Sequence, residues 1–189
     1  MREAEKTVYF VTGNKGKYDE VARIADDFDV HLKWVKRAKE EIQSDDLKEI
    51  ACFAAKNACV ETSHSVVADD SGFFVDALGG FPGPYSSYVF GTIGIEGILR
   101  LLGATRKRSA YFKTVVAFCE PNSNPISFSG IVKGVVGTEP RGMHGFGFDP
   151  IFLPNGSRGH TFAQMSTTEK NSLSHRSKAF SKLFGWLTK

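Results

Sequence analysis

Two rhythms of apolar residues run along this 189-residue chain, one typical of strands and one typical of helices. Residues 8–12 are mostly β-branched or aromatic and precede Gly13 and Asn14, which predicts a buried strand and a tight turn. After Lys17, apolar residues recur at i, i+3, i+4 and i+7, which predicts an amphipathic helix. Its apolar stripe consists of Val21, Ile24, Ala25 and Phe28. Residues 30–35 alternate polar and apolar side chains and predict a half-buried strand.

The next part of the chain continues this alternation of helix and strand. Ser44 is placed to cap a helix whose apolar face consists of Leu47, Ile50, Ala51, Ala54 and Ala58. Residues 65–69 predict a short strand that leads residues 69–72 into a loop, and the Gly- and Pro-rich residues 79–84 predict a second loop. Another amphipathic helix is expected over residues 95–102, ended by Gly103.

A long antiparallel hairpin is expected in the second half of the chain. Its two strands, residues 109–120 and 126–137, flank a turn that contains two prolines and two asparagines. Ser166 and Glu169 have the spacing of a capping box, which predicts the start of a short helix. A last helix carries Phe180, Leu183, Phe184 and Leu187 on one face. Together these elements predict one α/β domain that spans residues 1–189.

Composition and charge narrow the class of protein. Hydrophobic residues make up 41% of the chain and Phe occurs 16 times, which predicts a core rich in aromatic rings. The net charge of +3 is too mild to indicate nucleic-acid binding, so no nucleic-acid partner is expected. Cys52, Cys59 and Cys119 form no Cys-x-x-Cys pair, which fits free thiols in a reducing compartment. Without a long apolar run, the chain is expected to be cytoplasmic and to have no membrane partner.

The first candidate for chemistry lies between the first strand and the first helix, at residues 12–17. The start of a helix presents free N–H groups and a positive dipole end, both of which favour phosphate. Gly13 and Gly16 allow close approach of a ligand, and Lys15 and Lys17 add positive charge. The glycine spacing is too short for a Walker A loop, and Tyr18 stands where Ser or Thr would hold magnesium. The alternative is an ordinary turn with surface lysines.

The second candidate is the carboxylate pair Asp69 and Asp70, which ends the strand predicted at residues 65–69. A carboxylate here can bind a hard cation or accept a proton from water. Glu40 and Glu41 precede another helix, and one of them could bind the same magnesium ion. The alternative is an acidic turn in which an aspartate caps the backbone.

Two further segments carry side chains suited to a nucleobase. Residues 144–150 place Phe146 and Phe148 beside glycines, so that an exposed ring could stack on a base while Asp149 accepts a hydrogen bond. The alternative is a core turn with both rings buried. In residues 169–176, Lys170 could contact phosphate, and His175 and Arg176 could donate to a purine carbonyl, although a solvated helix start would look the same. One ligand, a nucleoside triphosphate, would account for all four segments.

In order and spacing, these four segments resemble the inosine triphosphate pyrophosphatase family, whose members act on non-standard purine nucleotides. The resemblance covers nearly the whole chain. It rests on residues 12–17 with Glu20, on 69–72 followed by 77–83, on 145–152, and on Glu169, Lys170 and 174–176. Residues 41–43, 85–88 and 144–146 look closest to the shorter, archaeal-type members. The family implies an elongated α/β fold of two lobes with a central mixed sheet flanked by helices, an active-site cleft between the lobes, and a homodimer.

The resemblance also implies a role for individual residues. Triphosphate binding falls to Thr12, Gly13, Asn14, Lys15, Gly16 and Lys17. Glu41 and Asp70 are the implied ligands of Mg2+, and Asp70 is also the implied proton acceptor that activates water. The other substrate contacts are Ser71, Phe146, Gly147, Phe148, Asp149, Lys170, His175 and Arg176. Lys56 is similar to a phosphate-binding lysine, and Phe148 stands where many relatives have Tyr or Trp. The match through residues 42–43 favours Glu41 over Glu40 as metal ligand.

The expected activity is therefore magnesium-dependent hydrolysis of ITP, dITP or XTP to the nucleoside monophosphate and pyrophosphate. A keto group at purine position 6 would accept from His175 or Arg176, whereas the amino group of adenine would leave a donor facing a donor. One alternative is a related pyrophosphatase that acts on modified pyrimidine nucleotides. The other is a non-enzymatic nucleic-acid-binding module, against which the mild charge and the carboxylate pair weigh.

Overall fold

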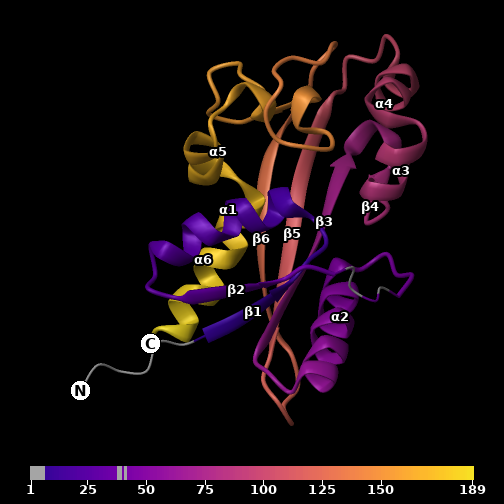
Figure 1. Ribbon diagram of the computed structural model, residues 1–189. Coiled ribbons are helices and arrows are strands. Elements are labelled where there is room, and N and C mark those ends of the chain that lie inside the picture. Colours follow the sequence, from indigo (N-terminus) through magenta and orange to yellow (C-terminus); the bar gives the residue numbers. More distant parts are fainter. Residues whose placement is uncertain (1–6, 38–39, 41) are drawn as a thin grey trace. The chain divides into compact units, whose positions relative to one another are not determined.

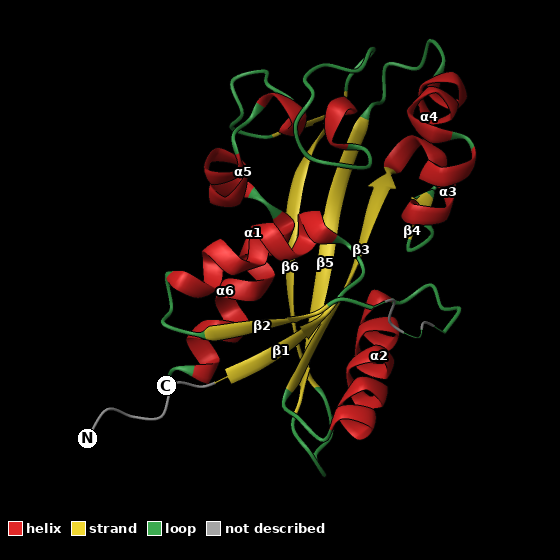
Figure 2. Cartoon of the chain, in the orientation of Figure 1, coloured by secondary structure: helices red, strands yellow, loops and turns green. Residues whose placement is uncertain are grey.

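A mixed β-sheet forms the centre of the computed structural model, which describes residues 7–37, 40 and 42–189. Within these residues seven strands follow the order β2-β1-β3-β5-β6-β7, with β4 paired to β3 (Figure 2). The strands are β1 (Thr7–Val11), β2 (His31–Val35), β3 (Val66–Val75), β4 (Pro82–Gly83), β5 (Ser109–Cys119), β6 (Ile126–Val136) and β7 (Phe152–Pro154). β1 runs parallel to β2 and β3, whereas β4 and β7 pair antiparallel with β3 and β6. The predicted α/β class with a mixed sheet is confirmed.

Six α-helices accompany the sheet in the described part of the chain. They are α1 (Lys15–Asp26), α2 (Leu47–Thr62), α3 (Ser86–Thr92), α4 (Gly94–Leu102), α5 (Thr167–Leu173) and α6 (His175–Leu187) (Figure 1). Three short 3-10 helices add Asp76–Leu78, Asp149–Ile151 and Phe162–Gln164. None of the helices in the described residues is long and apolar enough to cross a membrane.

The chain divides into two compact units, each assembled from separate stretches. Unit 1 contains the residues up to Asp70, Thr114–Gly130 and Arg176–Lys189. Unit 2 contains Ser71–Lys113 and Ile131–His175. Each unit has its own hydrophobic core.

The core of unit 1 lies between the sheet and two helices. Val8 and Phe10 of β1 are buried with the apolar stripe of α1 and with Phe180 of α6. The rings of Phe10 and Phe180 meet edge to face, with centroids 5.3 Å apart. α2 covers the other face of these strands (Figure 1). The helical stripes predicted from the sequence are thus the surfaces that pack on the sheet.

The core of unit 2 is built from aromatic rings. Phe73 of β3 stacks on Phe148 at 5.2 Å and meets Phe152 edge to face at 5.8 Å. Phe112 of β5 packs against Phe152 and Phe162. Aromatic pairs in these geometries add about 0.5–1.5 kcal/mol each beyond the area that they bury. The phenylalanine-rich composition therefore supplies aromatic rings to both cores.

Two local expectations were wrong. β3 does not end at Asp69 but continues to Val75, because Phe73 and Val75 are buried and β4 pairs with its second half. Gly72 permits that pairing, since a Cβ there would lie 2.6 Å from the carbonyl oxygen of Gly83. The cap of α2 is Asp46, whose carboxylate accepts from the Lys48 N–H, and not Ser44.

The other predicted elements are close to those observed. The hairpin strands are β5 and β6, and Gly103 ends α4. Ser166 and Glu169 form both hydrogen bonds of the capping box at the start of α5. α3 and the two-residue strand β4 lie where no helical or strand period was found, so neither was expected, and β4 falls within the loop expected over residues 79–84.

Candidate functional site

The loop between β1 and α1 is shaped by its own side chains. Asn14 is the N-cap of α1, and its side-chain oxygen accepts from the Lys17 N–H at 3.1 Å. The Asn14 N–H in turn donates to the Thr12 hydroxyl at 3.1 Å. Gly13, Asn14 and Lys15 are exposed. The loop therefore presents the start of a helix to solvent, which is an arrangement that favours anions.

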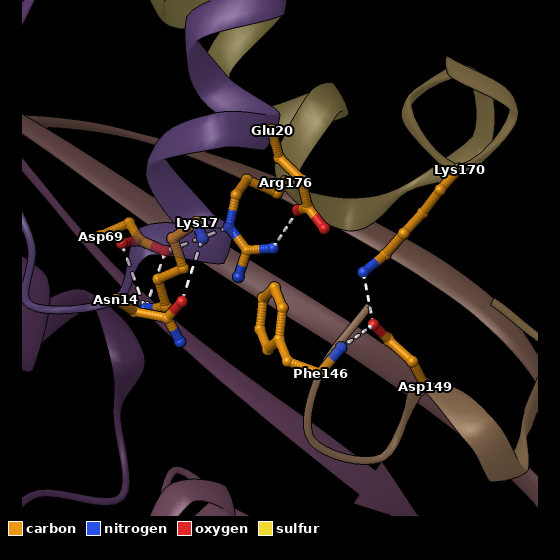
Figure 3. Close-up of polar contacts among 8 residues, drawn as sticks. All are labelled: Asn14, Lys17, Glu20, Asp69, Phe146, Asp149, Lys170 and Arg176. Atoms are coloured by element: carbon orange, nitrogen blue, oxygen red, sulfur yellow. Dashed lines mark hydrogen bonds and ion pairs between the residues drawn. The ribbon is translucent and has the colours of Figure 1, made fainter. Parts of the chain in front are cut away.

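A buried group of charges lies beside this loop in unit 1. The Lys17 ammonium is 3.1 Å from the carboxylate of Asp69, which is 1% exposed. Asp69 also lies 3.5 Å from the guanidinium of Arg176, which follows His175 in α6 and belongs to unit 1. Arg176 donates to Glu20 of α1 at 2.6 Å (Figure 3). Two cations and two carboxylates thus compensate one another, as buried charges require.

Asp69 and Asp70 face opposite sides of the sheet. Successive residues of a strand alternate between faces, so Asp69 shares a face with Val67, which packs in the core with α1 and α6. Asp70 therefore points to the face that α2 covers, and it is 7% exposed. The two adjacent carboxylates therefore lie in different surroundings. Asp69 pairs with Lys17 of α1 and Arg176 of α6, whereas Asp70 lies on the side of the sheet that α2 covers.

The metal ligands expected from the sequence are only partly described. Asp70 is a buried carboxylate on the α2 side, and Glu40 lies on the same side because it accepts from the Asn57 amide of α2 at 3.1 Å. Carboxylate oxygens are the ligands that Mg2+ prefers, so these donors fit that ion. Glu41 lies outside the described residues. Among the residues that are described, no group of three or more His, Cys, Asp or Glu side chains is arranged as a metal site.

Unit 2 holds a second charged group, around Asp149. Its carboxylate accepts from the Phe146 N–H at 2.9 Å and from the Lys170 ammonium at 2.6 Å. Lys170 is 3% exposed, and its Nζ lies 4.7 Å from the centroid of the Phe146 ring (Figure 3). Gly145 has φ +76°, and a Cβ there would meet the Asp149 carboxylate at 2.2 Å. Asp149 thereby fixes the turn that carries Phe146 and links it to α5.

The two phenylalanines of this turn have different surroundings. Phe146 is half-buried, whereas Phe148 is 2% exposed and packs against Phe73 and Phe90 in the core of unit 2. The expectation of an exposed ring is therefore wrong for Phe148. Gly147 between them has φ +61°, a backbone conformation that turns the second ring inward.

Two other predicted contacts, one buried and one half-buried, make interactions within the protein. His175 is 3% exposed, and its ring stacks on Phe112 at 4.8 Å within unit 2. Lys56 donates to the carbonyl of Ser123 at 2.6 Å and so joins α2 to the turn between β5 and β6. Ser71 follows Asp70 in β3 and is half-buried.

The sequence profile of the Ham1 family matches residues 8–186. The chain belongs to the Ham1 family. An archaeal relative from Methanopyrus kandleri, named dITP/XTP pyrophosphatase, is 46% identical over 95% of both chains. A protein of the same name from Saccharolobus solfataricus is 48% identical over 94% of this chain and 91% of its own.

Solved structures of Ham1 proteins have the same fold. The protein from Coxiella burnetii gives a TM-score of 0.83 at 30% identity and covers 97% of this chain and 98% of its own. The Staphylococcus aureus Ham1 protein gives 0.81 at 32% identity over 96% and 98%. The resemblance inferred from the four sequence segments is thus confirmed.

Glu20 was not among the candidate functional residues that the local sequence patterns indicated. It appeared only within the resemblance, yet it is 4% exposed and is the partner of Arg176. Its position was a usable signal, because it lies four residues before Ile24 and next to Val21 on the apolar side of α1. A carboxylate on such a stripe indicates a buried cation partner.

Proposed function

We propose that this Ham1 protein hydrolyses the non-standard purine nucleoside triphosphates ITP, dITP and XTP to the monophosphate and pyrophosphate, and so removes them from the nucleotide pool. The observation that carries the proposal is the exposed start of α1, with Lys17 held beside it by a buried carboxylate. The dITP/XTP pyrophosphatases named above, nearly equal in length to this chain, support the choice of substrate.

The triphosphate binds at residues 12–17. N–H groups at the start of α1 donate to phosphate oxygens, and the helix dipole favours their charge. Lys15 is exposed and available to phosphate after exchange of its surface pair with Asp19, which is worth at most about 1 kcal/mol. Lys17 keeps a fixed position through Asp69, so that its charge is already in place when pyrophosphate leaves.

Asp70 accepts the proton of the attacking water. It is a buried carboxylate on the face of β3 opposite to that of Asp69, the carboxylate that pairs with Lys17. Asp70 and Glu41 are the proposed ligands of Mg2+, which would supply positive charge at the phosphates and lower the pKa of a bound water. Magnesium dependence is an expectation from this donor chemistry.

Of the residues expected to recognise the base, Phe146, Asp149 and Lys170 belong to unit 2 and Arg176 to unit 1, whereas Phe148 and His175 are packed in the core of unit 2. Phe146, the ring of its turn that is not buried in the core, offers a face for stacking. Asp149 holds the backbone of that residue, and the Lys170 ammonium lies against its ring. The Arg176 guanidinium has five donors, so it can serve a keto group in addition to Glu20.

We also propose that the protein is a cytoplasmic homodimer with no membrane or nucleic-acid partner, as its family resemblance and mild charge suggest. A hydrolase for modified pyrimidine nucleotides is the remaining alternative of the same class.

The test is a substrate panel: purified protein with Mg2+, given ITP, dITP, XTP, the four common triphosphates and a set of modified pyrimidine triphosphates. Pyrophosphate and orthophosphate are measured separately. The proposal predicts pyrophosphate from the three non-standard purines at a kcat/KM at least tenfold above that for ATP. Orthophosphate as first product, or a preference for pyrimidines, would contradict it.

A further inference from the structure

Trp34 contacts the phosphate loop from the neighbouring strand β2. Its indole Nε1–H donates to the carbonyl oxygen of Thr12 at 2.9 Å. Its ring stacks on Tyr18 of α1, with centroids 4.7 Å apart and planes inclined by 11°. The Nζ of Lys36 lies 5.7 Å from the same ring. One side chain thus contacts Thr12, where the loop begins, and Tyr18 in the helix that follows it.

We propose that Trp34 is a positioning residue for triphosphate binding: it fixes the Thr12–Gly13 peptide and the first turn of α1 in the arrangement that receives phosphate. The inference rests on the proposed function, in which residues 12–17 bind the triphosphate. No motif in the sequence points to Trp34, which lies more than 15 residues further along the chain.

The geometry of a peptide unit explains how the Trp34 indole can orient the Gly13 N–H without contacting it. In a planar trans peptide the C=O of one residue and the N–H of the next point in opposite directions. The Thr12–Gly13 peptide is trans. When Trp34 holds the Thr12 carbonyl on its own side, the Gly13 N–H is directed away from β2. Gly13 is exposed, so this donor faces the side from which a ligand can approach.

The stack on Tyr18 fixes the other end of the loop. Tyr18 packs at the edge of the unit 1 core, and its N–H donates to the Asn14 carbonyl at 3.2 Å. Residues 13–17 therefore lie between two points that Trp34 holds. A loop ordered before binding loses less conformational entropy when the ligand arrives, and this strengthens binding without any new contact.

This role predicts a particular kinetic signature. The loop contacts phosphate both in the bound substrate and in the transition state, so weaker ordering raises KM and leaves kcat nearly unchanged. It also weakens binding of pyrophosphate by the same factor. The effect does not depend on the base, because Trp34 acts on the phosphate end.

The test compares Trp34→Phe with Trp186→Phe. The first variant keeps a ring for Tyr18 but removes the donor, and the second changes the only other tryptophan, which packs on Phe118 and Phe128. For Trp34→Phe we expect KM for ITP and XTP, and the inhibition constant of magnesium pyrophosphate, to rise about three- to tenfold, the loss for one neutral hydrogen bond. The kcat should stay within twofold, and Trp186→Phe should match the unchanged protein.

Three results separate the outcomes. KM and pyrophosphate inhibition within twofold of the control would overturn the inference, and so would a lower melting temperature with unchanged KM, which marks a purely structural role. Failure of the unchanged protein to hydrolyse triphosphates or bind pyrophosphate would instead sink the proposed function.

A second measurement needs no substitution at Trp34. The indole N–H resonance of Trp34 is assigned as the one that remains in Trp186→Phe. Phosphate that accepts from Gly13 N–H polarises the shared peptide and makes the Thr12 carbonyl a stronger acceptor. Pyrophosphate at an inhibiting concentration should therefore shift the Trp34 resonance and leave that of Trp186 in place. An unmoved Trp34 resonance would overturn the inference even if Trp34→Phe fails to fold.

Discussion

Replacing Arg176 by Met should lower the free energy of unfolding by several kcal/mol, about 3–5, because it breaks a buried ion pair. Arg176 is 1% exposed and lies beside two carboxylates, Glu20 at 2.6 Å and Asp69 at 3.5 Å. Methionine fills much of the same volume but leaves Glu20 buried without its cation. Breaking a buried pair in this way costs about 3–5 kcal/mol. In a chain of this size that corresponds to a fall in melting temperature of roughly 6–20 °C.

Two variants turn this prediction into a comparison. Lys15→Met breaks an ion pair of 2.5 Å whose side chains are 72% and 50% exposed, so it should cost no more than about 1 kcal/mol. The double variant Glu20→Gln with Arg176→Met also removes the carboxylate that loses its guanidinium partner, while Asp69 keeps Lys17, so it should regain part of the lost stability.

Urea unfolding of the four proteins, followed by circular dichroism, gives the free energies. A loss below about 1 kcal/mol for Arg176→Met, or a double variant less stable than the single one, would refute the buried-network interpretation. The same samples, assayed on ITP and ATP, also test base recognition. If Arg176 donates to the keto group, the ratio of kcat/KM for ITP over ATP should narrow about ten- to a hundredfold. An unchanged ratio leaves Arg176 a structural role only.

Four further outcomes are expected. Asp70→Asn should abolish turnover while its far-UV spectrum and melting curve stay native, and residual turnover above about 1% would exclude Asp70 as the proton acceptor. Glu41→Gln should weaken the response of the activity to Mg2+ more than Glu40→Gln does. Phe146→Ala should raise KM for ITP and ATP alike, because stacking is indifferent to the base, and a selective loss for ITP would contradict that role. Burial, together with a hydrogen bond to Cys119, raises the pKa of the Cys59 thiol from 9.0 to about 11. The unfolded chain therefore loses this proton first, so stability should fall as pH rises from 9 to 11, and Cys59→Ala should flatten the fall; identical pH profiles of urea midpoints would disprove it.

Local sequence patterns were sufficient for the elements that depend on local interactions. The stripe of α1, the capping box of Ser166 and Glu169, and the apolar face of α6 each arise within two or three helical turns. The hairpin of β5 and β6 is also local, because one short turn joins its strands. These features were predicted to within two residues.

Features that depend on distant partners were not available from local patterns. β3 carries two aspartates through its middle, and Asp69 is compensated there by Lys17 and Arg176, which lie 52 and 107 positions away in the sequence. Phe146 and Phe148 both follow a glycine in the sequence, and the choice of which ring is buried rests on the contacts of Phe148 with Phe73 and Phe90. The order of the four motifs identified the family, whereas the pairing of their side chains required the structure.

Hydrolysis to the monophosphate and pyrophosphate, as proposed, requires that water attacks the α-phosphorus and that pyrophosphate leaves as a unit. The most direct test is hydrolysis of ITP in water enriched in 18O, with the label located by mass spectrometry. Attack at the α-phosphorus places one 18O atom in inosine monophosphate and none in pyrophosphate. Label in pyrophosphate would mean attack on the β-phosphorus, and label in orthophosphate with inosine diphosphate would mean attack at the γ-phosphorus; either result would contradict the account.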